Sequence, residues 1–535
     1  MRRSLFVSLA ALALCAAPAV AQFGPPPSGF AVENPVLRRM WALGMDSSQL
    51  QRYGQVLFDS LGPRLTGSPE SEAAENWLIG VYQSLGITAR KEQYGTWRGW
   101  VRGRTHIDLV QPRVRTLDGT MRAWSPGTGG QTVRGEVVEF PDVADSNAFA
   151  QWLPAVSGKF VALSFPQPTC RPDSAWHEYA TQQTYDQMRT LRDTARVQWN
   201  RRFTRLGFAN SDVSPDARLV QRLEAAGALG VLTSVWSSGY GTHRVFGMRA
   251  ERALGLELDC EDYGLLARLA EHRQGPVIEV MAESQSLGEV PVFNVIGEIR
   301  GRELPNEYVM LSAHFDSWDG ASGATDNGTG TITMLEAMRI LKAAYPAPRR
   351  TILVGHWNSE ENGLIGSAGF VADHPQIIQN LQALFNQDNG TGRVESMSAS
   401  GYPMASQNLA RYLAMLPADI TRNIRFSFPG MPGGGGTDHA SFVCAGAPGF
   451  GLGSGGWDYF AYTWHTNRDT YDKLSWDDLR NNATLTAMLA YLASEDPQRV
   501  PRDRRTVLSP GPGGQPGTWP ACVQPPRATP TPPER

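Results

Sequence analysis

The chain has 535 residues, more than one hydrophobic core normally serves, so we expect more than one domain. Its net charge of −3 at pH 7 argues against nucleic acid as a partner, because nucleic-acid-binding proteins carry an excess of basic residues. Beyond the N-terminal segment no apolar run has the eighteen or so residues that a membrane span requires, so we expect no membrane anchor.

Residues 1–21 combine two arginines, an apolar run and a small-residue cleavage pattern, which predicts a secretory signal peptide and a mature protein that starts at Gln22. We therefore expect a secreted or periplasmic protein. Four of the five cysteines lie outside the predicted signal peptide, and an even number in an oxidising compartment indicates up to two disulfides with three possible connectivities. By sequence position alone, we favour the pairs Cys170–Cys260 and Cys444–Cys522.

Residues 22–134 contain two helical patterns between Met45 and Leu85, separated by the turn-forming stretch "GPRLTGSP". Short strands are predicted over residues 102–140. The pattern changes over residues 135–283, where "GKFVALSFP" predicts a strand and "RLEAAGALGVLTS" a helix that runs into a strand. No cluster of acids, histidines or cysteines in this region resembles a metal or nucleophile site, so we interpret it as an inserted domain that serves shape or substrate gating.

Residues 284–500 alternate short apolar runs with helices, which predicts an α/β fold with a mixed, mainly parallel sheet covered on both faces. Strands are predicted at residues 308–313, 351–354 and 384–386, and a helix over residues 331–344. Residues 501–535 are rich in proline and lack periodicity, so we expect an extended or disordered tail.

Polar residues follow each predicted strand of this sheet. Because ligands of open α/β sheets bind beyond the carboxyl ends of the strands, we expect these residues to meet. Two histidines and three carboxylates are the donors that two adjacent divalent ions need, and nitrogen and oxygen donors suit zinc. The candidate residues are His314, Asp316, Asp326, Glu360, Glu361, Asp388 and His465.

The candidates suggest separate roles. Asp326 lies in a glycine-rich turn, so its carboxylate is suited to bridge two ions roughly 3.5–4 Å apart. Asp316 is placed to accept the second N–H of His314 and fix its tautomer. If Glu361 binds a metal, its neighbour Glu360 stays free beside a metal-bridging water and suits a general base.

The motifs "AHFDSWDGASGATDNGTG", "SEENGLIGSAGF", "GTDHASF" and "WHTNRDTYDKL" resemble metallopeptidase family 28, the co-catalytic zinc aminopeptidases and glutamate carboxypeptidases. The resemblance covers roughly residues 45–495 and is greatest to the plasma glutamate carboxypeptidase branch, whose members carry a protease-associated insert. Residues 135–283 resemble that insert, and residues 284–500 the zinc-binding part of the catalytic domain that residues 22–134 begin. The resemblance implies two zinc ions, one bound by His314 and Asp388 and one by Glu361 and His465.

The same resemblance implies that Asp326 bridges the ions, that the Asp326–Asn327 bond is cis and that Glu360 is the base. One position departs from the family, because several members have a tyrosine where this chain has Trp464. The oxyanion donor is therefore open, with Tyr459 and Tyr462 as alternatives. Asp438 and His439 are candidates for the substrate pocket.

The sequence thus predicts an exported di-zinc exopeptidase that hydrolyses a terminal peptide bond of peptides or dipeptides, in aminopeptidase or carboxypeptidase mode. One alternative is a single-zinc glutaminyl cyclase, because related cyclases share the fold and also have tryptophan before the last histidine ligand. Another is a non-catalytic, receptor-like binding protein on the same scaffold. The oligomeric state stays open, with a homodimer among the alternatives.

Overall fold

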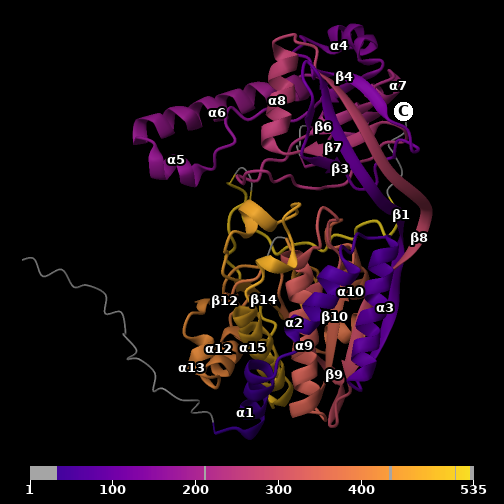
Figure 1. The fold of residues 1–535 in the computed structure, drawn as a ribbon. Coiled ribbons are helices and arrows are strands. Elements are labelled where there is room, and N and C mark those ends of the chain that lie inside the picture. Colours follow the sequence, from indigo (N-terminus) through magenta and orange to yellow (C-terminus); the bar gives the residue numbers. More distant parts are fainter. Residues whose placement is uncertain (1–32, 210–212, 433–435, 512–513, 530–535) are drawn as a thin grey trace, which may run out of the picture.

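The computed structural model describes residues 33–529 except 210–212, 433–435 and 512–513. The predicted signal peptide and the start at Gln22 lie outside the described residues. The described chain forms two lobes joined by a long two-stranded ribbon (Figure 1). None of its helices combines the length and the apolar character that crossing a membrane would require.

The lower lobe in Figure 1 contains the mixed sheet that the sequence predicts. Its central strands β14, β11, β9 and β10 are parallel, and β8 and β12 pair with them in antiparallel fashion at the two sides. From one edge to the ribbon, the strands are β13 (Arg425–Ser427), β12 (Val394–Ser398), β14 (Gly449–Ser454), β11 (Leu381–Asn386), β9 (Leu304–His314), β10 (Arg350–Trp357) and β8 (Val277–Ile299).

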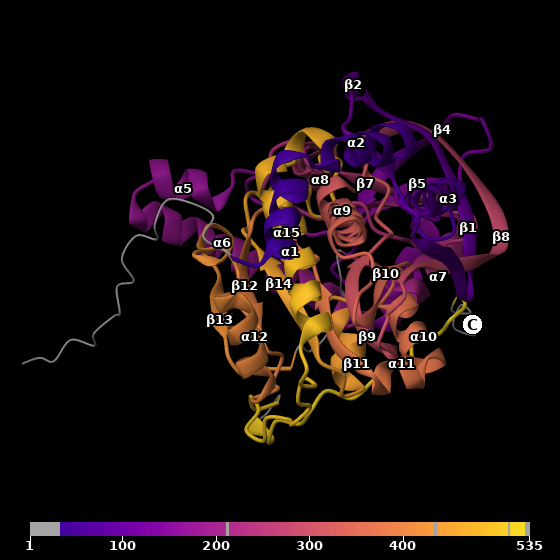
Figure 2. The same cartoon turned by 90° about the horizontal axis from the view of Figure 1, so that it is seen from below.

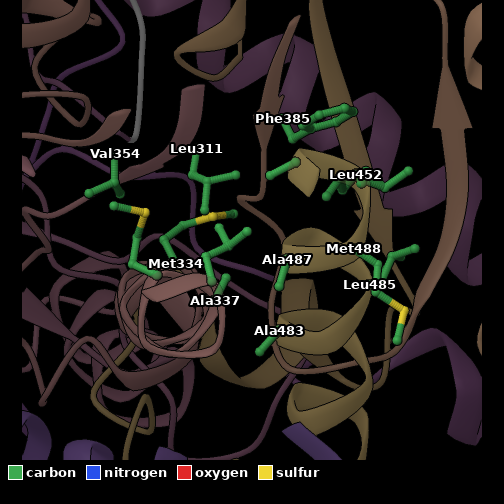
Figure 3. Close-up of a cluster of buried hydrophobic side chains, with 14 of the residues drawn as sticks. Leu311, Met334, Ala337, Val354, Phe385, Leu452, Ala483, Leu485, Ala487 and Met488 are labelled. Carbon is green, nitrogen blue, oxygen red and sulfur yellow. The ribbon is translucent and has the colours of Figure 1, made fainter. Parts of the chain in front are cut away.

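Helices cover both faces of this sheet. Figure 2 shows α9 (Thr329–Ala344) and α15 (Trp476–Glu495) on one side of β9, β10 and β11, with α10 (Ile365–Asp373) and α11 (Pro375–Gln379) on the other. Successive side chains of β9 point to opposite faces of the sheet. Val309 and Leu311 pack in the hydrophobic core under α9 and α15, and Met310 packs in the hydrophobic core on the other face. Figure 3 shows Leu311, Val354 and Phe385 of the sheet facing Met334 of α9 and Ala487 of α15.

The N-terminal helices pack against the α9 and α15 face. Ser68 caps α3 by accepting a hydrogen bond from the N–H of Ser71, and Pro69 occupies the first helical position, where a missing N–H costs nothing. The two predicted helical patterns are confirmed. The elements are α1 (Pro35–Trp41), η1 (Ala42–Asp46), α2 (Leu50–Gly54), η2 (Gln55–Leu61) and α3 (Pro69–Ser84).

The connecting ribbon pairs β1 (Thr88–Gln111) with β8 in antiparallel register. The prediction of short strands from residue 102 is wrong for its first part, because residues 88–111 form one strand. Glycines in β1 sit at irregularities of the register, between Gln93 and Gly95 and again between Gly99 and Trp100. Such glycines interrupt the alternation of side chains without ending the strand.

The upper lobe contains the predicted insert, residues 135–283. Its sheet continues from β8 through β4 (Val133–Glu139), β5 (Lys159–Ala162), β6 (Gly230–Thr233) and β7 (Leu254–Leu258) to β3 (Gly119–Met121). The lobe also includes residues before 135, since β3 pairs with β7 and β2 (Arg115–Thr116) with β1. Its helices are α4 (Ser146–Trp152), η3 (Leu153–Val156), α5 (Asp173–Tyr179), α6 (Gln182–Thr204), α7 (Ala217–Ala225) and α8 (Cys260–Glu271).

The remaining helices of the lower lobe surround the end of the sheet. They are α12 (Ala405–Ala414), α13 (Ala418–Thr421), α14 (His439–Cys444), η5 (Tyr459–Thr463) and η6 (Tyr471–Lys473). Both expected disulfides, Cys170–Cys260 and Cys444–Cys522, are confirmed.

The proline-rich tail is extended but attached. No helix or strand forms in the part of residues 501–529 that the structure describes. Trp519 packs on Tyr402 and donates a hydrogen bond to the carbonyl oxygen of Val443, and the carbonyl oxygen of Arg527 accepts one from the N–H of Thr96 on β1. The tail therefore lies along the lower lobe and reaches the ribbon.

Candidate metal and active site

The candidate residues converge beyond the carboxyl ends of the parallel strands, as expected for an open α/β sheet. His314 is the last residue of β9, and Asp388 follows the end of β11 by two positions. Glu361 lies in the turn after β10. Asp326 belongs to the short helix η4 (Ala324–Gly328), which leads into α9, and His465 follows η5.

The five predicted ligands form two groups that share Asp326. The Nε2 atom of His314 lies 3.2 Å from Oδ1 of Asp388 and 3.4 Å from Oδ1 of Asp326. The Nε2 atom of His465 lies 3.1 Å from Oε2 of Glu361 and 3.1 Å from Oδ2 of Asp326. In each group the candidate ligand atoms lie within 4.8 Å of one another. Asp326 thus presents one oxygen to each histidine, which is the arrangement that a bridging carboxylate needs.

The chemistry of these atoms fits divalent cations. Oδ2 of Asp326 and Oε1 of Glu361 are buried and lack a hydrogen-bond partner among the residues that the structure describes. A buried carboxylate oxygen without a partner is costly, and a bound cation removes that cost. Imidazole nitrogen and carboxylate oxygen are donors that zinc accepts.

Electrostatics support the same interpretation. Burial acts to lower the pKa of His465, but the Glu361 and Asp326 carboxylates outweigh it and raise this pKa to about 9. Burial raises the pKa of Glu361 to about 7 despite the opposing effect of His465. The cluster therefore holds more negative charge than its low-polarity surroundings accommodate, and positive charge stabilises it.

Asp316 organises the site through two of its groups, the backbone carbonyl and the carboxylate. The Nδ1 atom of His314 lies 3.0 Å from the backbone oxygen of Asp316 and 3.6 Å from its carboxylate, so the carbonyl takes the N–H and fixes the tautomer. The carboxylate instead accepts hydrogen bonds from the backbone N–H groups of Glu360, at 3.1 Å, and Glu361, at 3.3 Å. It therefore positions the turn that carries both glutamates.

Glu360 is the free carboxylate of this turn. Among the described residues, no group hydrogen-bonds its side chain, whereas Trp318 donates to Oε2 of Glu361 at 2.9 Å. Burial, opposed by His314, raises the pKa of Glu360 well above its ordinary value.

Two residues of the site have left-handed backbone conformations. Ser359, which precedes Glu360, has φ of 60°, and His465 has φ of 61°. Such left-handed non-glycine residues are uncommon and cluster at functional sites.

Two buried residues that the sequence analysis did not identify hold the loop of Asp326. Asp469 accepts hydrogen bonds from the N–H groups of Thr325, at 2.6 Å, and Asp326, at 3.0 Å. Arg64 donates to the carbonyl oxygens of Phe315, Ser322 and Gly323 at 2.7–3.0 Å. Asp469 lies in the quoted motif "WHTNRDTYDKL" and Arg64 in "GPRLTGSP". The only feature of the sequence that could have identified them is that each is a charged residue within a turn.

The Asp326–Asn327 peptide bond is cis, as the resemblance implies.

The other candidates are less closely associated with the ligands. Trp464 stacks on the ring of His465 at 3.8 Å between centroids, so its indole face covers that ligand. Tyr459 and Tyr462 both line a cavity of about 580 Å³ beside Thr325.

Asp438 and His439 lie at the start of α14, and the charge of Asp438 acts on Glu360 of the candidate site. Asp438 is fully buried, and neither of its carboxylate oxygens has a hydrogen-bond partner among the described residues. His439 begins α14, and its ring lies near Gly451 of β14, where an added Cβ would come within 3.3 Å of it. Burial lowers the pKa of His439 to about 4, so its ring is neutral at neutral pH.

Comparisons with known proteins show similarity to peptidases. Residues 294–490 match the family described as Peptidase family M28. Carboxypeptidase Q of Bos taurus is 24% identical over 455 residues, which are 84% of this chain and 85% of that protein.

Solved structures share the fold. A peptidase M28 precursor from Shewanella amazonensis superposes with a TM-score of 0.65 at 22% identity, over 88% of this chain and 98% of that one. A zinc aminopeptidase from Bacillus subtilis gives 0.53 at 16% identity, over 85% and 97%. The mixed sheet with helices on both faces is therefore the fold of these exopeptidases. Residues 294–490 thus match a peptidase family M28 domain, and the chain is similar to carboxypeptidase Q over 84% of its length.

Proposed function

We propose that this chain is an exported zinc exopeptidase that binds two ions and removes a terminal residue from a peptide. One observation carries the proposal. Asp326 presents an oxygen to each of two histidine–carboxylate groups, while the neighbouring glutamate, Glu360, keeps a free carboxylate beside them. The predicted signal peptide and the two disulfides support export, because disulfides persist in oxidising compartments.

The residues that would hold the ions are His314 and Asp388 in one group, Glu361 and His465 in the other, and Asp326 in both. When bound, the zinc ions act as Lewis acids that polarise the scissile carbonyl and make a water molecule more acidic. Glu360 accepts the proton of the attacking water and delivers it to the leaving amine, so that the amine departs neutral.

Neighbouring residues hold these groups in place. Asp316 fixes the backbone of both glutamates, and Trp318 orients Glu361 through its indole N–H. Tyr459 is the favoured donor to the oxyanion, because it is buried and the Asp326 and Asp388 carboxylates act on its phenol. Burial first, and then these charges, raise its pKa well above the ordinary value, so the phenol keeps its proton.

Product analysis tests the proposal. The mature protein is incubated with zinc and a mixture of free and end-blocked dipeptides and tripeptides, with a chelator-treated sample in parallel, and products are identified by mass spectrometry. We expect loss of one terminal residue that the chelator abolishes. Ring closure of N-terminal glutamine would indicate the cyclase instead, and absence of any product would indicate a binding protein.

The substitution Glu360→Gln tests the assigned base. Because general-base catalysis supplies about a hundred- to ten-thousand-fold, we expect kcat to fall by that factor while zinc content stays unchanged. Full activity of this variant would refute the assignment of Glu360.

A further inference from the structure

A cavity of about 510 Å³ opens beside the site at the junction of the two lobes, large enough for an amino-acid side chain or a short peptide end. Glu361 and His465 line one side of it. The ribbon, the upper lobe and Pro526 of the tail contribute the other walls. Four aromatic rings dominate its lining: Trp97, Trp124, Phe246 and Trp318.

Packed rings connect the proposed metal ligands to an arginine in this cavity. Trp318, which donates to Glu361, lies 5.7 Å from Trp124 in an edge-to-face arrangement. The guanidinium of Arg98 lies over the ring of Trp124, 4.5 Å from the ring centre. The positive charge is therefore held two rings away from the site of reaction.

The cavity offers hydrogen-bond donors that have no acceptor. Nε of Arg98 and Nε1 of Trp97 are buried, and neither has a partner among the described residues. A second arginine that lines the cavity, Arg249, is exposed, and no carboxylate within the described part of the chain forms an ion pair with it or with Arg98. The Nη1 group of Arg98 donates to the carbonyl oxygen of Met248 at 2.9 Å. Burial first, and then the charge of Arg249, lower the pKa of Arg98 to about 9, although the charge of Glu289 acts to raise it. Two neighbouring cations and unused donors are suited to an anion.

The acidic residues that line the cavity are already engaged. Asp216 pairs with Arg218 at 2.8 Å and accepts a hydrogen bond from the N–H of Ala209 at 2.9 Å. Glu361 is a proposed metal ligand. Neither is free to bind the ammonium group of a peptide N-terminus, and the two arginines would repel it.

We propose that this cavity binds a carboxylate of the peptide substrate and that Arg98 is its specificity-determining residue, with Arg249 adding positive charge at the mouth. The carboxylate is either the C-terminus of the substrate or an acidic side chain next to the scissile bond. The inference rests on the proposed function, because the cavity has this role only if Glu361 and His465 belong to a peptidase centre.

A substrate set in which the amino end is constant separates the two sources of the carboxylate. Kinetics are measured for Ala-Phe, Ala-Phe amide, Ala-Glu amide and Ala-Gln amide. Preference for Ala-Phe over its amide indicates the main-chain carboxylate, and preference for Ala-Glu amide over Ala-Gln amide indicates the side chain. Equal kcat/KM within both pairs would overturn the proposal, whereas no cleavage of any substrate by the zinc-loaded protein would overturn the proposed function first.

The substitution Arg98→Gln tests the residue itself. Because a hydrogen bond to a charged group is lost, we expect KM for the preferred carboxylate substrate to rise about 10- to 100-fold, with little change in kcat and little effect on the amide. Arg98→Lys should retain part of the preference. Arg134→Gln, at an exposed arginine of the upper lobe that pairs with Glu279, is the matched control and should change nothing.

Binding without turnover provides an independent measurement. Isothermal titration of the zinc-loaded protein with acetyl-Phe and acetyl-Phe amide, and with acetyl-Glu amide and acetyl-Gln amide, should show tighter binding of one carboxylate form, which Arg98→Gln abolishes. If Arg98→Gln does not fold, Arg249→Gln replaces it. Because Arg249 is exposed, we expect its affinity for the carboxylate ligand to fall by only about 3- to 10-fold. Unchanged affinity in the variant that folds would refute the role of the arginines.

Discussion

At the scale of single residues, the convergence of three candidate ligands was predictable because each follows a strand whose end the sequence marks. His314, Glu361 and Asp388 were identified in this way. The atoms that support them were not predictable, since a pattern of residue types does not say which oxygen faces a histidine. Asp316 thus contributes its carbonyl to His314 and its carboxylate to the glutamate turn, whereas the sequence indicated only that Asp316 accepts the N–H of the histidine.

The bridging role of Asp326 predicts the metal content of two variants. We expect two zinc ions per chain in the wild type, loss of both high-affinity sites in Asp326→Ala and loss of only one in Asp388→Ala. Loss of a ligand should weaken a site by more than the roughly 100-fold that removal of a supporting hydrogen bond costs. Zinc per chain after dialysis, measured by mass spectrometry of the metal, gives the answer. Asp472→Ala, at an exposed residue, is the control, and two tightly held ions in Asp326→Ala would refute the bridge.

At the scale of elements, periodicity predicted the helices and central strands but not the long ribbon. The α9 prediction was accurate because its apolar residues repeat at helical spacing over sixteen positions. Strand β1 was divided incorrectly because its glycines look like turns, and only the pairing with β8 shows that they are bulges. Arg64 and Asp469 were missed because their partners are backbone groups that only the folded chain brings near.

Strand β10 contains a buried histidine that predicts how stability depends on pH. His356 contacts the hydroxyl of Tyr82 at 2.6 Å, and burial lowers its pKa from 6.5 to about 3. The imidazole of His356 therefore binds a proton more weakly in the folded state than in the unfolded state. Its contribution to the free energy of unfolding is complete above pH 6.5 and is lost as pH falls towards 3. Each pH unit within this window costs up to about 1.4 kcal/mol.

Replacing this histidine should flatten the profile. We expect the free energy of unfolding of His356→Gln to fall less steeply than that of the wild type between pH 6.5 and 4.5, by about one proton. Urea denaturation at fixed zinc concentration measures both slopes. His374→Gln, at a partly exposed histidine beside Glu92, is the comparison and should not reproduce the effect. Parallel profiles for wild type and His356→Gln would contradict the assignment.

At the scale of the whole molecule, the sequence indicated two domains and a tail but not how they combine around the site. The cavity beside Glu361 takes walls from the ribbon, the upper lobe and the tail, which are far apart in sequence. No local pattern encodes such a junction. Composition alone also understated the tail. A proline-rich segment without periodicity gives no sign of the hydrogen bonds of Trp519 and Arg527, or of the packing of Trp519 on Tyr402, that attach it beyond the disulfide.

The attachment of the tail predicts a separable effect on stability and on the cavity. In the double variant Cys444→Ser and Cys522→Ser, the link between residues 78 positions apart is lost, which should lower the free energy of unfolding by about 2–4 kcal/mol. The tail should also become a substrate for trypsin at Arg502, Arg504 and Arg505. Zinc content should not change, because no tail residue is among the proposed ligands. KM should rise, because Pro526 no longer closes one wall of the cavity beside Glu361.

The corresponding double variant of the upper lobe, Cys170→Ser and Cys260→Ser, distinguishes a general loss of stability from release of the tail. It removes a link of similar span, 90 positions, without touching residues 501–529. Limited proteolysis should therefore leave the tail intact in this control. If trypsin cuts the tail equally fast in both double variants, or in neither, the contacts of Trp519 and Arg527 rather than the Cys444–Cys522 bond decide where the tail lies.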